Sequence, residues 1–564
     1  MNNPIEKKNN KSVLALVMFS AVVSSIIVYF VNIKKTAVTW PAIDNLPAVC
    51  RILDKTCLLS DFFTNASSDL TPRSPYIYVL SEVTRLVDNG IGGGLAVIKA
   101  ILLALLPALM GLVIFASINL HASKNVLIKN NKHMSPSLIF TVIAVPILIL
   151  SLQGKLGVAL SVAWWMPLYF DATPHNVSIF LTLIGFVFIY CRYNLTGAIF
   201  VFLGGIIHPA VGIFTSIFSC ILFSNLVNFK KNFSLFVFGF TTTLLAAVLI
   251  KLFFESGSLL STQEFVRIYV IEGHPAHYLP SQFGSFSRIP WYASFLSVVG
   301  GLILTTIALY AQSNTVWRNS FLALIAYLAA VACQFFFVEV YPIKIMAILG
   351  PSRFTMFGSW FLSIFAFLVI ANWLNKNTYA INISKKFNAG LFLVQWRYVA
   401  LCCFLLLLMI VYYSSNSNSY QLSDEGNKKL VDFAINNTNK QDVFALPFYF
   451  PRVMFPLVTE RGVFHGNGFP FSEKYFSEWD ARNALINGSN AAIKNLPGSW
   501  IGEKYANHYR ALFANDFINA ASRYRLDWVV VESEFSNQFA SCKADFESLK
   551  YKVYSIISLK ICAK

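Results

Sequence analysis

Charged residues are scarce in this sequence, at 13% of 564 residues, whereas hydrophobic residues make up 56%. Soluble domains carry about twice that charged fraction. This scarcity excludes an ordinary soluble enzyme, and the 52 phenylalanines exceed what a soluble core of this size could hide from water. We therefore predict that most of the chain lies in a lipid bilayer.

Acidic residues are also few, 27 against 44 lysines and arginines, which gives a net charge of +17. Such an excess can indicate nucleic-acid binding, but here the basic residues stand in short clusters between apolar runs. That distribution is typical of membrane topology signals, and no nucleic-acid partner is expected. No internal repeat is evident either, so an inverted-repeat transporter gains no support from the sequence.

About eleven apolar stretches are candidates to cross the hydrocarbon core as helices. They lie near residues 12–33, 93–118, 137–153, 176–191, 194–207, 209–227, 234–254, 291–311, 320–337, 352–374 and 397–414. The lysines and arginines between them place the N-terminus on the cytoplasmic side. The predicted fold is an α-helical polytopic membrane protein, with a transmembrane domain over residues 1–414 and a large first outer loop at 34–92.

The remaining residues, 415–564, are predicted to form an extracytoplasmic α/β domain, because an odd number of spans leaves them outside. About 150 residues are enough for a separate core. Strand-like runs alternate there with helical patterns, the strands at 442–446, 462–464 and 527–531 and the helices at 472–486 and 503–522. Polar and aromatic residues of this tail suit either a sugar-binding surface or an ordinary solvated edge: Glu460, Arg461, His465, Asn467, Glu478, Trp479 and Arg482.

The positions of four cysteines agree with the predicted membrane topology. Cys50 and Cys57 lie in the first outer loop, and Cys542 and Cys562 lie in the tail. Each pair is near enough in sequence to form a disulfide in an oxidising compartment, although all four could instead be small buried hydrophobic residues. No cysteine spacing indicates a zinc or haem site.

Asp61, in the first outer loop, precedes two phenylalanines. A carboxylate among aromatic residues at a membrane surface is poorly solvated, which raises its pKa and makes it a usable general base. Asp69 is the nearest second carboxylate, and Arg73 is a candidate cationic partner. The alternative is that Asp61 caps a helix beginning at Phe62.

Histidines supply further candidates. His274 and His277, beside Pro275, could bind a metal, a phosphate or sugar hydroxyls, or could lie in a solvated turn. His208 stands before Pro209 in an apolar run, where an ionisable residue is expected to be functional unless it is a neutral histidine at a helix kink. One kinked span at this point, in place of two spans, would invert the topology of everything that follows.

Arg353 is expected at the outer end of a late span, where its guanidinium could hold a lipid-linked phosphate in a bidentate manner. It could equally be an anchor that reaches from the bilayer into the interface. Asp171 and His175 add two polar groups to the same outer face.

Taken in order, these features resemble the GT-C superfamily of integral membrane glycosyltransferases, over nearly the whole chain. A first helix, a large outer loop and an outer α/β tail accompany the motifs, which are Asp61, Pro72-Arg73-Ser74-Pro75, His208-Pro209 and His274-Pro275-Ala276-His277-Tyr278-Leu279-Pro280. The sequence departs from many relatives because Asp61 has no adjacent second carboxylate.

The resemblance implies transfer of a sugar from a polyprenyl-phosphate donor, with Asp61 or Asp69 as the base and a divalent metal as an option. The residues that would bind the donor are Arg73, His208, His274, His277, Tyr278 and Arg353. The acceptor would be an envelope glycan, a lipid or a protein on the outer face of a bacterial inner membrane. The rival functions are a polysaccharide polymerase or ligase that uses a lipid-linked oligosaccharide, a lipid or solute transporter, and a scaffold.

Overall fold

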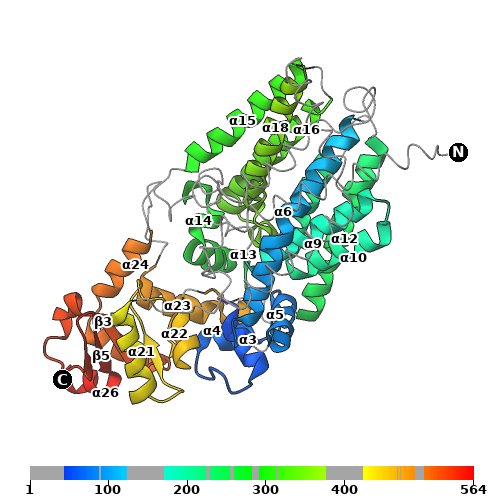
Figure 1. Ribbon diagram of the computed structural model, residues 1–564. Coiled ribbons are helices and arrows are strands. Elements are labelled where there is room, and N and C mark those ends of the chain that lie inside the picture. The colour runs from blue at the N-terminus through cyan, green and yellow to red at the C-terminus, as the bar shows by residue number, and fades with distance from the viewer. Residues whose placement is uncertain are drawn as a thin grey trace.

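The computed structural model describes residues 44–87, 90–122, 171–223, 229–254, 260–282, 291–312, 315–376, 424–466, 468–470, 472–489 and 501–563. Figure 1 shows a bundle of long helices with a smaller α/β module at one end. The predicted spans at 12–33, 137–153 and 397–414 lie outside the described residues.

Eight helices of the bundle coincide with the eight predicted spans that fall within the described residues. They are α6 (Gly93–Ala122), α9 (Pro174–Tyr190), α10 (Asn194–Ile207), α11 (Pro209–Phe223), α12 (Phe229–Phe254), α15 (Trp291–Ala311), α16 (Trp317–Gln334) and α18 (Gly358–Lys376). Three stretches are long and apolar enough to cross a membrane: Gly93–Val113, Trp317–Val340 and Lys344–Ile370. The total of about eleven spans stays a prediction.

The outer faces of the bundle are apolar as well as its interior. Leu195, Leu296 and Leu304 are 77%, 63% and 68% exposed. A water-facing surface would rarely carry so many large apolar side chains, whereas a lipid-facing surface requires them. The bundle is therefore the membrane part of the molecule.

Two antiparallel helices, rather than one kinked helix, flank His208. The hydroxyl of Ser178, near the start of α9, donates to the carbonyls of Gly204 at 2.7 Å and His208 at 3.3 Å, at the end of α10. Phe186, farther along α9, stacks on Phe223 at the end of α11, with ring centroids 6.2 Å apart. The chain thus reverses at His208, and both helices pack along α9.

Short helices cover one end of the bundle. The first outer loop forms α3 (Leu46–Leu53), α4 (Phe62–Ser68) and α5 (Ser74–Val87). A second group consists of α13 (Thr262–Phe265), η2 (Val266–Gly273), α14 (Pro275–Tyr278) and η3 (Pro280–Gln282). A third consists of η4 (Phe335–Val340), α17 (Lys344–Leu349) and η5 (Pro351–Phe357). The predicted disulfide between Cys50 and Cys57 is present and joins α3 to the turn that follows it.

The module contains a five-stranded sheet in the order β2-β1-β3-β5-β4, in which β2, β1 and β3 are parallel and β5 and β4 are antiparallel to their neighbours. The strands are β1 (Val443–Ala445), β2 (Gly462–Val463), β3 (Trp528–Glu532), β4 (Phe546–Glu547) and β5 (Tyr551–Ser555). The helices are α21 (Glu425–Asn437), α22 (Met454–Thr459), η6 (Glu473–Tyr475), α23 (Phe476–Asn487), α24 (Ile501–Arg510), α25 (Ala514–Arg523), η7 (Ser533–Phe539) and α26 (Ile556–Cys562).

The first three strands are those that the sequence predicts, and the predicted disulfide between Cys542 and Cys562 is present. The helical pattern predicted at 503–522 is instead two helices, α24 and α25. The break lies before Phe513, whose backbone N–H donates to the carboxylate of Asp516 at 2.8 Å and so begins a new helix.

Candidate anion site at the membrane edge

The structure brings six of the eight predicted site residues into one group and adds His175 to it. Electrostatic interactions connect members of this group, which come from five separate parts of the chain. The members, which we call the arginine–histidine cluster, are Arg73, His175, His208, His274, His277, Tyr278 and Arg353. Its charged and imidazole side chains are half-buried, so they remain in contact with open space.

Arg353, on η5, lies against Tyr278. One guanidinium nitrogen of Arg353 donates to the hydroxyl of Tyr278, and the guanidinium carbon lies 5.1 Å from the centre of that ring. The same hydroxyl is 2.9 Å from the hydroxyl of Tyr269. Burial raises the pKa of Tyr278 well above its ordinary value, so the phenol stays neutral and does not cancel the arginine charge.

The backbone around Arg353 is held in a fixed position. Gly350 has a φ of +62°, and a Cβ at this position would lie 3.0 Å from the ring of Tyr278. Any other residue would therefore be both strained and crowded. The amide of Gln334 donates to the carbonyl of Tyr278 at 2.6 Å and accepts from the backbone N–H of Ser352 at 3.1 Å, which joins α16, α14 and η5.

Hydrogen bonds assign a different tautomer to each of two histidines. Nδ1 of His274 lies 2.9 Å from the carbonyl of Tyr269, so it carries the proton and leaves Nε2 as an acceptor. Burial, with Arg353 and Arg73 nearby, lowers the pKa of His274 to about 4, so this ring is neutral at neutral pH. Nδ1 of His208 accepts from the N–H of Val211 at 3.4 Å, which leaves Nε2 of His208 as a donor.

His175, at the start of α9, extends this row of imidazoles. Its ring centre lies 4.4 Å from that of His208, while the rings of His274 and His277 are 5.9 Å apart. The cluster thus offers both donors and acceptors beside its two cations. Such a set can hold a phosphate and, next to it, sugar hydroxyls.

Arg73 immediately precedes α5 and brings the second positive charge. Burial lowers its pKa to about 10, so it remains a cation at neutral pH, and the positive charge of Arg353 acts in the same direction. Two guanidinium groups that each disfavour the other's charge provide a strong attraction for an anion.

Asp44 is a carboxylate of this site that the sequence reasoning missed. Burial raises the pKa of Asp44 to about 7, and the positive charge of Arg73 opposes that rise. The sequence arguments considered carboxylates with aromatic neighbours, and Asp44 has none within two residues. The feature of the sequence that could have pointed to Asp44 is its position in the first outer loop, just ahead of α3.

Asp61 lies apart from the arginine–histidine cluster, between the first outer loop and the module. One carboxylate oxygen accepts from the backbone N–H and the hydroxyl of Thr64, both at 2.7 Å, and so caps α4. The other oxygen accepts from the N–H of Val463 in β2 at 2.9 Å. Burial raises the pKa of Asp61, and Arg482 of the module is the cation that opposes this rise. The capping alternative therefore describes its position.

Asp69 is also apart from the cluster. Its carboxylate lies 3.3 Å from the ammonium of Lys474 and accepts from the hydroxyl of Tyr475 at 3.0 Å. Asp61 and Asp69 thus each join the first outer loop to the module. Figure 1 shows α4 next to the module helices α22 and α23.

The module also holds the loops that carry the cluster. Lys344 pairs with Glu473 at 2.8 Å, and Arg267 of η2 pairs with Asp480 of α23 at 2.7 Å. The ring of His274 lies 4.8 Å from that of Phe469. The position of the segment that carries His274 and His277, which we call the histidine loop, therefore depends on the docking of the module.

Most of the polar residues of the tail that suited a sugar-binding surface are instead buried in the module or contact other parts of it. Arg461 donates to the carbonyls of Ile435 at 3.0 Å and Thr438 at 2.6 Å, at the end of α21. His465 is buried, which lowers its pKa to about 3. Asn467 lies outside the described residues.

The part of the chain that the structure describes contains no group of three or more His, Cys, Asp or Glu side chains arranged to hold a metal. The divalent metal that the sequence left as an option stays a prediction.

No family model and no curated protein matches this chain. Among solved structures, the chain is similar to the apo form of the oligosaccharyltransferase of Archaeoglobus fulgidus, with 10% identity, 93% of this chain and 70% of that chain covered, and a TM-score of 0.43. The same enzyme tethered with an acceptor peptide gives 10% identity, coverage of 92% and 69%, and a TM-score of 0.43.

The archaeal oligosaccharyltransferase AglB in complex with an inhibitory peptide and a dolichol-phosphate gives 11% identity, coverage of 92% and 70%, and a TM-score of 0.36. This enzyme is a member of the GT-C superfamily, the one that the sequence motifs resemble. The likeness concerns the overall course of the chain.

Proposed function

We propose that this protein is a membrane glycosyltransferase that takes a sugar from a polyprenyl-phosphate-linked donor. The acceptor is an envelope glycan, a lipid or a protein on the outer face of a bacterial inner membrane. The observation that carries the proposal is the arginine–histidine cluster, in which Arg73 and Arg353 lie close together at the edge of the helical bundle. The phosphodiester of such a donor carries one negative charge and the phosphate that leaves carries two, so these two cations would be balanced most fully as the sugar departs.

The place of Arg353 suits a lipid-linked phosphate. It belongs to the stretch Lys344–Ile370, which is long and apolar enough to cross a membrane, and it stands near the end where the short outer segments begin. A phosphate that carries a polyprenyl tail lies at this depth, because its tail occupies the hydrocarbon while its head meets water. A guanidinium can contact two oxygens of such a head group at once.

Asp44 supplies the base in this proposal. Its pKa of about 7 makes it basic enough to accept the proton of an acceptor hydroxyl while part of it remains ionised at neutral pH. The acceptor oxygen forms a bond to the anomeric carbon as the bond from that carbon to the phosphate oxygen breaks. The phosphate leaves with the bonding electrons, and Arg73 and Arg353 stabilise its added negative charge.

The test is sugar transfer by purified protein in proteoliposomes, from a panel of labelled polyprenyl-phosphate sugars to a crude envelope acceptor fraction. Transfer by the wild type should fall at least about 100-fold in Arg353→Met, which keeps an unbranched flexible side chain but removes the guanidinium and its charge. Lys440→Met is the matched control, since Lys440 is exposed and pairs with Glu460 of the module. Equal transfer by Arg353→Met and the wild type would contradict the proposal.

A polymerase or ligase would use the same kind of lipid phosphate but carry a preformed oligosaccharide. Adding lipid-linked oligosaccharides to the donor panel, in parallel with the single-sugar donors, separates these activities in the same assay. We expect the single-sugar donor to be the better substrate.

A further inference from the structure

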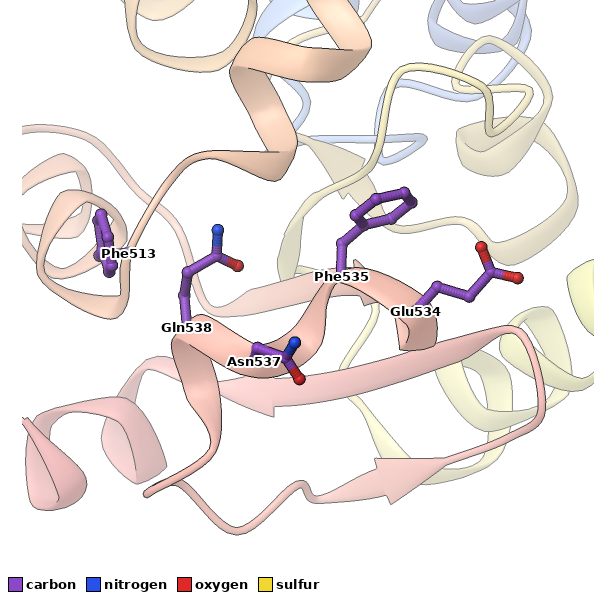
Figure 2. Close-up of a pocket in the computed structure, with 5 residues that line it drawn as sticks. All are labelled: Phe513, Glu534, Phe535, Asn537 and Gln538. Atoms are coloured by element: carbon purple, nitrogen blue, oxygen red, sulfur yellow. The ribbon is translucent and has the colours of Figure 1, made fainter.

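Two arginines of the module differ in how their charge is balanced. Arg510 lies over Phe535, one of the residues that line a hollow of about 350 Å³ along η7 (Figure 2). Both carboxylate oxygens of Glu532 accept from Arg510, at 2.5 and 3.1 Å. Arg452 is completely buried, and within the described residues it has no carboxylate at ion-pair distance. A buried cation without a counter-charge is costly, so the surroundings of Arg452 favour an anion.

The guanidinium of Arg452 is only partly satisfied. Its Nε donates to the carbonyl of Pro447 at 3.1 Å and its Nη1 to the amide oxygen of Asn487 at 3.2 Å, but its Nη2 has no hydrogen-bond partner. Its carbon lies 5.5 Å from the ring centre of Phe448 and 5.9 Å from that of Tyr509. Burial lowers the pKa of Arg452 to about 10, so it stays a cation at neutral pH. Ring faces attract a cation but carry no net charge to balance it.

Two more buried polar atoms without a hydrogen-bond partner lie in the same part of the module. They are Nδ1 of His465 and Nδ2 of Asn483, on residues that are 4% and 3% exposed. Asn487 donates to the amide oxygen of Asn483 at 2.9 Å. Asn483 and Arg452 both affect the ionisation of His465. The residues therefore form one group, which we call the buried donor group: Arg452, His465, Asn483 and Asn487.

The buried donor group lies at the carboxyl ends of two parallel strands, β1 and β2. His465 follows β2 by two residues, and Pro447, whose carbonyl accepts from Arg452, follows β1 by two residues. In open α/β sheets, ligands bind outside the carboxyl ends of the parallel strands. The loop that carries Arg452 also carries Tyr449, which is 46% exposed, so this loop runs from the surface of the module to the group.

We propose that the buried donor group binds one inorganic phosphate ion. Nη2 of Arg452 and Nδ2 of Asn483 can only donate, and Nδ1 of His465 can carry a proton, so the ligand must supply acceptors. Phosphate has oxygens on all sides for these donors and brings the negative charge that Arg452 lacks. A water molecule could accept from two of the donors but would leave the charge unbalanced. The burial of the whole group favours a small ion over a phosphate ester.

This site does not depend on the proposed function, because the buried donor group shares no residue with the arginine–histidine cluster. A phosphate held there would join the loops that follow β1 and β2 to α23, which carries Asn483 and Asn487. A ligand that binds only the folded module stabilises it, so the melting temperature of the module should rise with phosphate concentration.

The experiment measures binding of radiolabelled phosphate to full-length protein in nanodiscs by equilibrium dialysis. Arg353→Met serves as the parent protein, so that the arginine–histidine cluster does not contribute, and it should bind one phosphate per chain. Asn487→Asp in this parent should weaken binding about tenfold or more, because its carboxylate would replace the amide oxygen that lies 3.2 Å from Nη1 of Arg452 and would supply the missing charge. Lys440→Met in the same parent is the control and should bind like it, since Lys440 is exposed.

Asn483→Leu tests the site independently, because it removes one donor, keeps the size of the side chain and adds no charge. It should also weaken binding about tenfold. Absence of saturable phosphate binding by the folded parent would overturn the proposal, and so would equal affinity in the parent and both asparagine variants. If acetate displaced the label as well as unlabelled phosphate does, the choice of phosphate would be wrong, because the group would then take a carboxylate.

Wild-type protein reports on the arginine–histidine cluster separately. A second phosphate should bind to the wild type only if that cluster is also a phosphate site, whereas the buried donor group is occupied in both proteins. The two proposals can therefore fail independently of each other.

Discussion

Arginines in two regions of the molecule have different surroundings. In the module, Arg482 pairs with Glu478 at 2.7 Å, donates to the carbonyl of Phe464 at 2.9 Å, and lies within 5 Å of the rings of Phe62 and Tyr524. Within the described residues, Arg353 has no carboxylate within ion-pair distance, and its guanidinium lies on the neutral Tyr278. A cation that is fully surrounded serves the fold, whereas one that faces a neutral partner is available to a ligand.

The largest expected effect comes from removing the arginine that is available to a ligand. Arg353→Met should lower transfer at least about 100-fold with little change in thermal stability, because the residue serves the ligand. Transfer assays and scanning calorimetry on the same preparation measure both quantities. A large fall in the melting temperature would instead place Arg353 with the structural arginines.

Asp44→Asn should lower transfer by about 100-fold or more, since it removes the proposed base. The pKa of Asp44 also predicts how the transfer rate changes with pH. With a pKa of about 7, the ionised form of Asp44 increases as pH rises, so transfer should rise between pH 6 and 8. The rising limb should be absent in Asp44→Asn. A wild-type rate that is flat over this range would exclude Asp44 as the base.

Arg482→Met should act in the opposite way and destabilise the module by about 2 kcal/mol, because it leaves the buried carbonyl of Phe464 without its donor. Limited proteolysis and thermal unfolding report this change. Arg525→Met is a suitable control, since the side chain of Arg525 is 49% exposed and its ion pair with Asp527 is long, at 3.4 Å. If the two variants unfolded alike, the structural role of Arg482 would be refuted.

The smallest expected effect concerns the docking of the module. In a double-mutant cycle, Lys344→Met and Glu473→Gln should show a coupling of about 1 kcal/mol, because this pair is mostly buried. The same variants should raise the KM for the donor more than they lower kcat, since they shift the histidine loop without removing a group that contacts the reacting atoms. Additive effects would indicate that the pair does not transmit docking to the site.

Much of the fold could be predicted from the sequence, because long apolar runs and alternating strands are local patterns. The spans near 194–207 and 209–227 are one example: Pro209 marks the break, and the structure shows two helices there. The strands β4 and β5 were missed. They are short, and their pairing with β3 depends on contacts that no local pattern contains.

The site was predictable in part for the same reason. The predicted membrane topology is enough to place Arg73, His274 and Arg353 together on the outer face. Asp61 shows the limit, because its aromatic neighbours correctly indicate burial but not the partner, which is the N–H of Val463, 402 residues away. Contacts between distant parts of the chain therefore decide which partners a buried carboxylate has, and a local sequence pattern does not contain them.

The most direct test of the central claim is the affinity of the arginine–histidine cluster for a lipid phosphate that carries no sugar. Farnesyl phosphate can be titrated into nanodisc-embedded wild type, Arg353→Met and Lys440→Met. We predict that the wild type and Lys440→Met bind alike and that Arg353→Met binds about 100-fold more weakly. Equal affinity in all three proteins would show that the cluster is not a phosphate site.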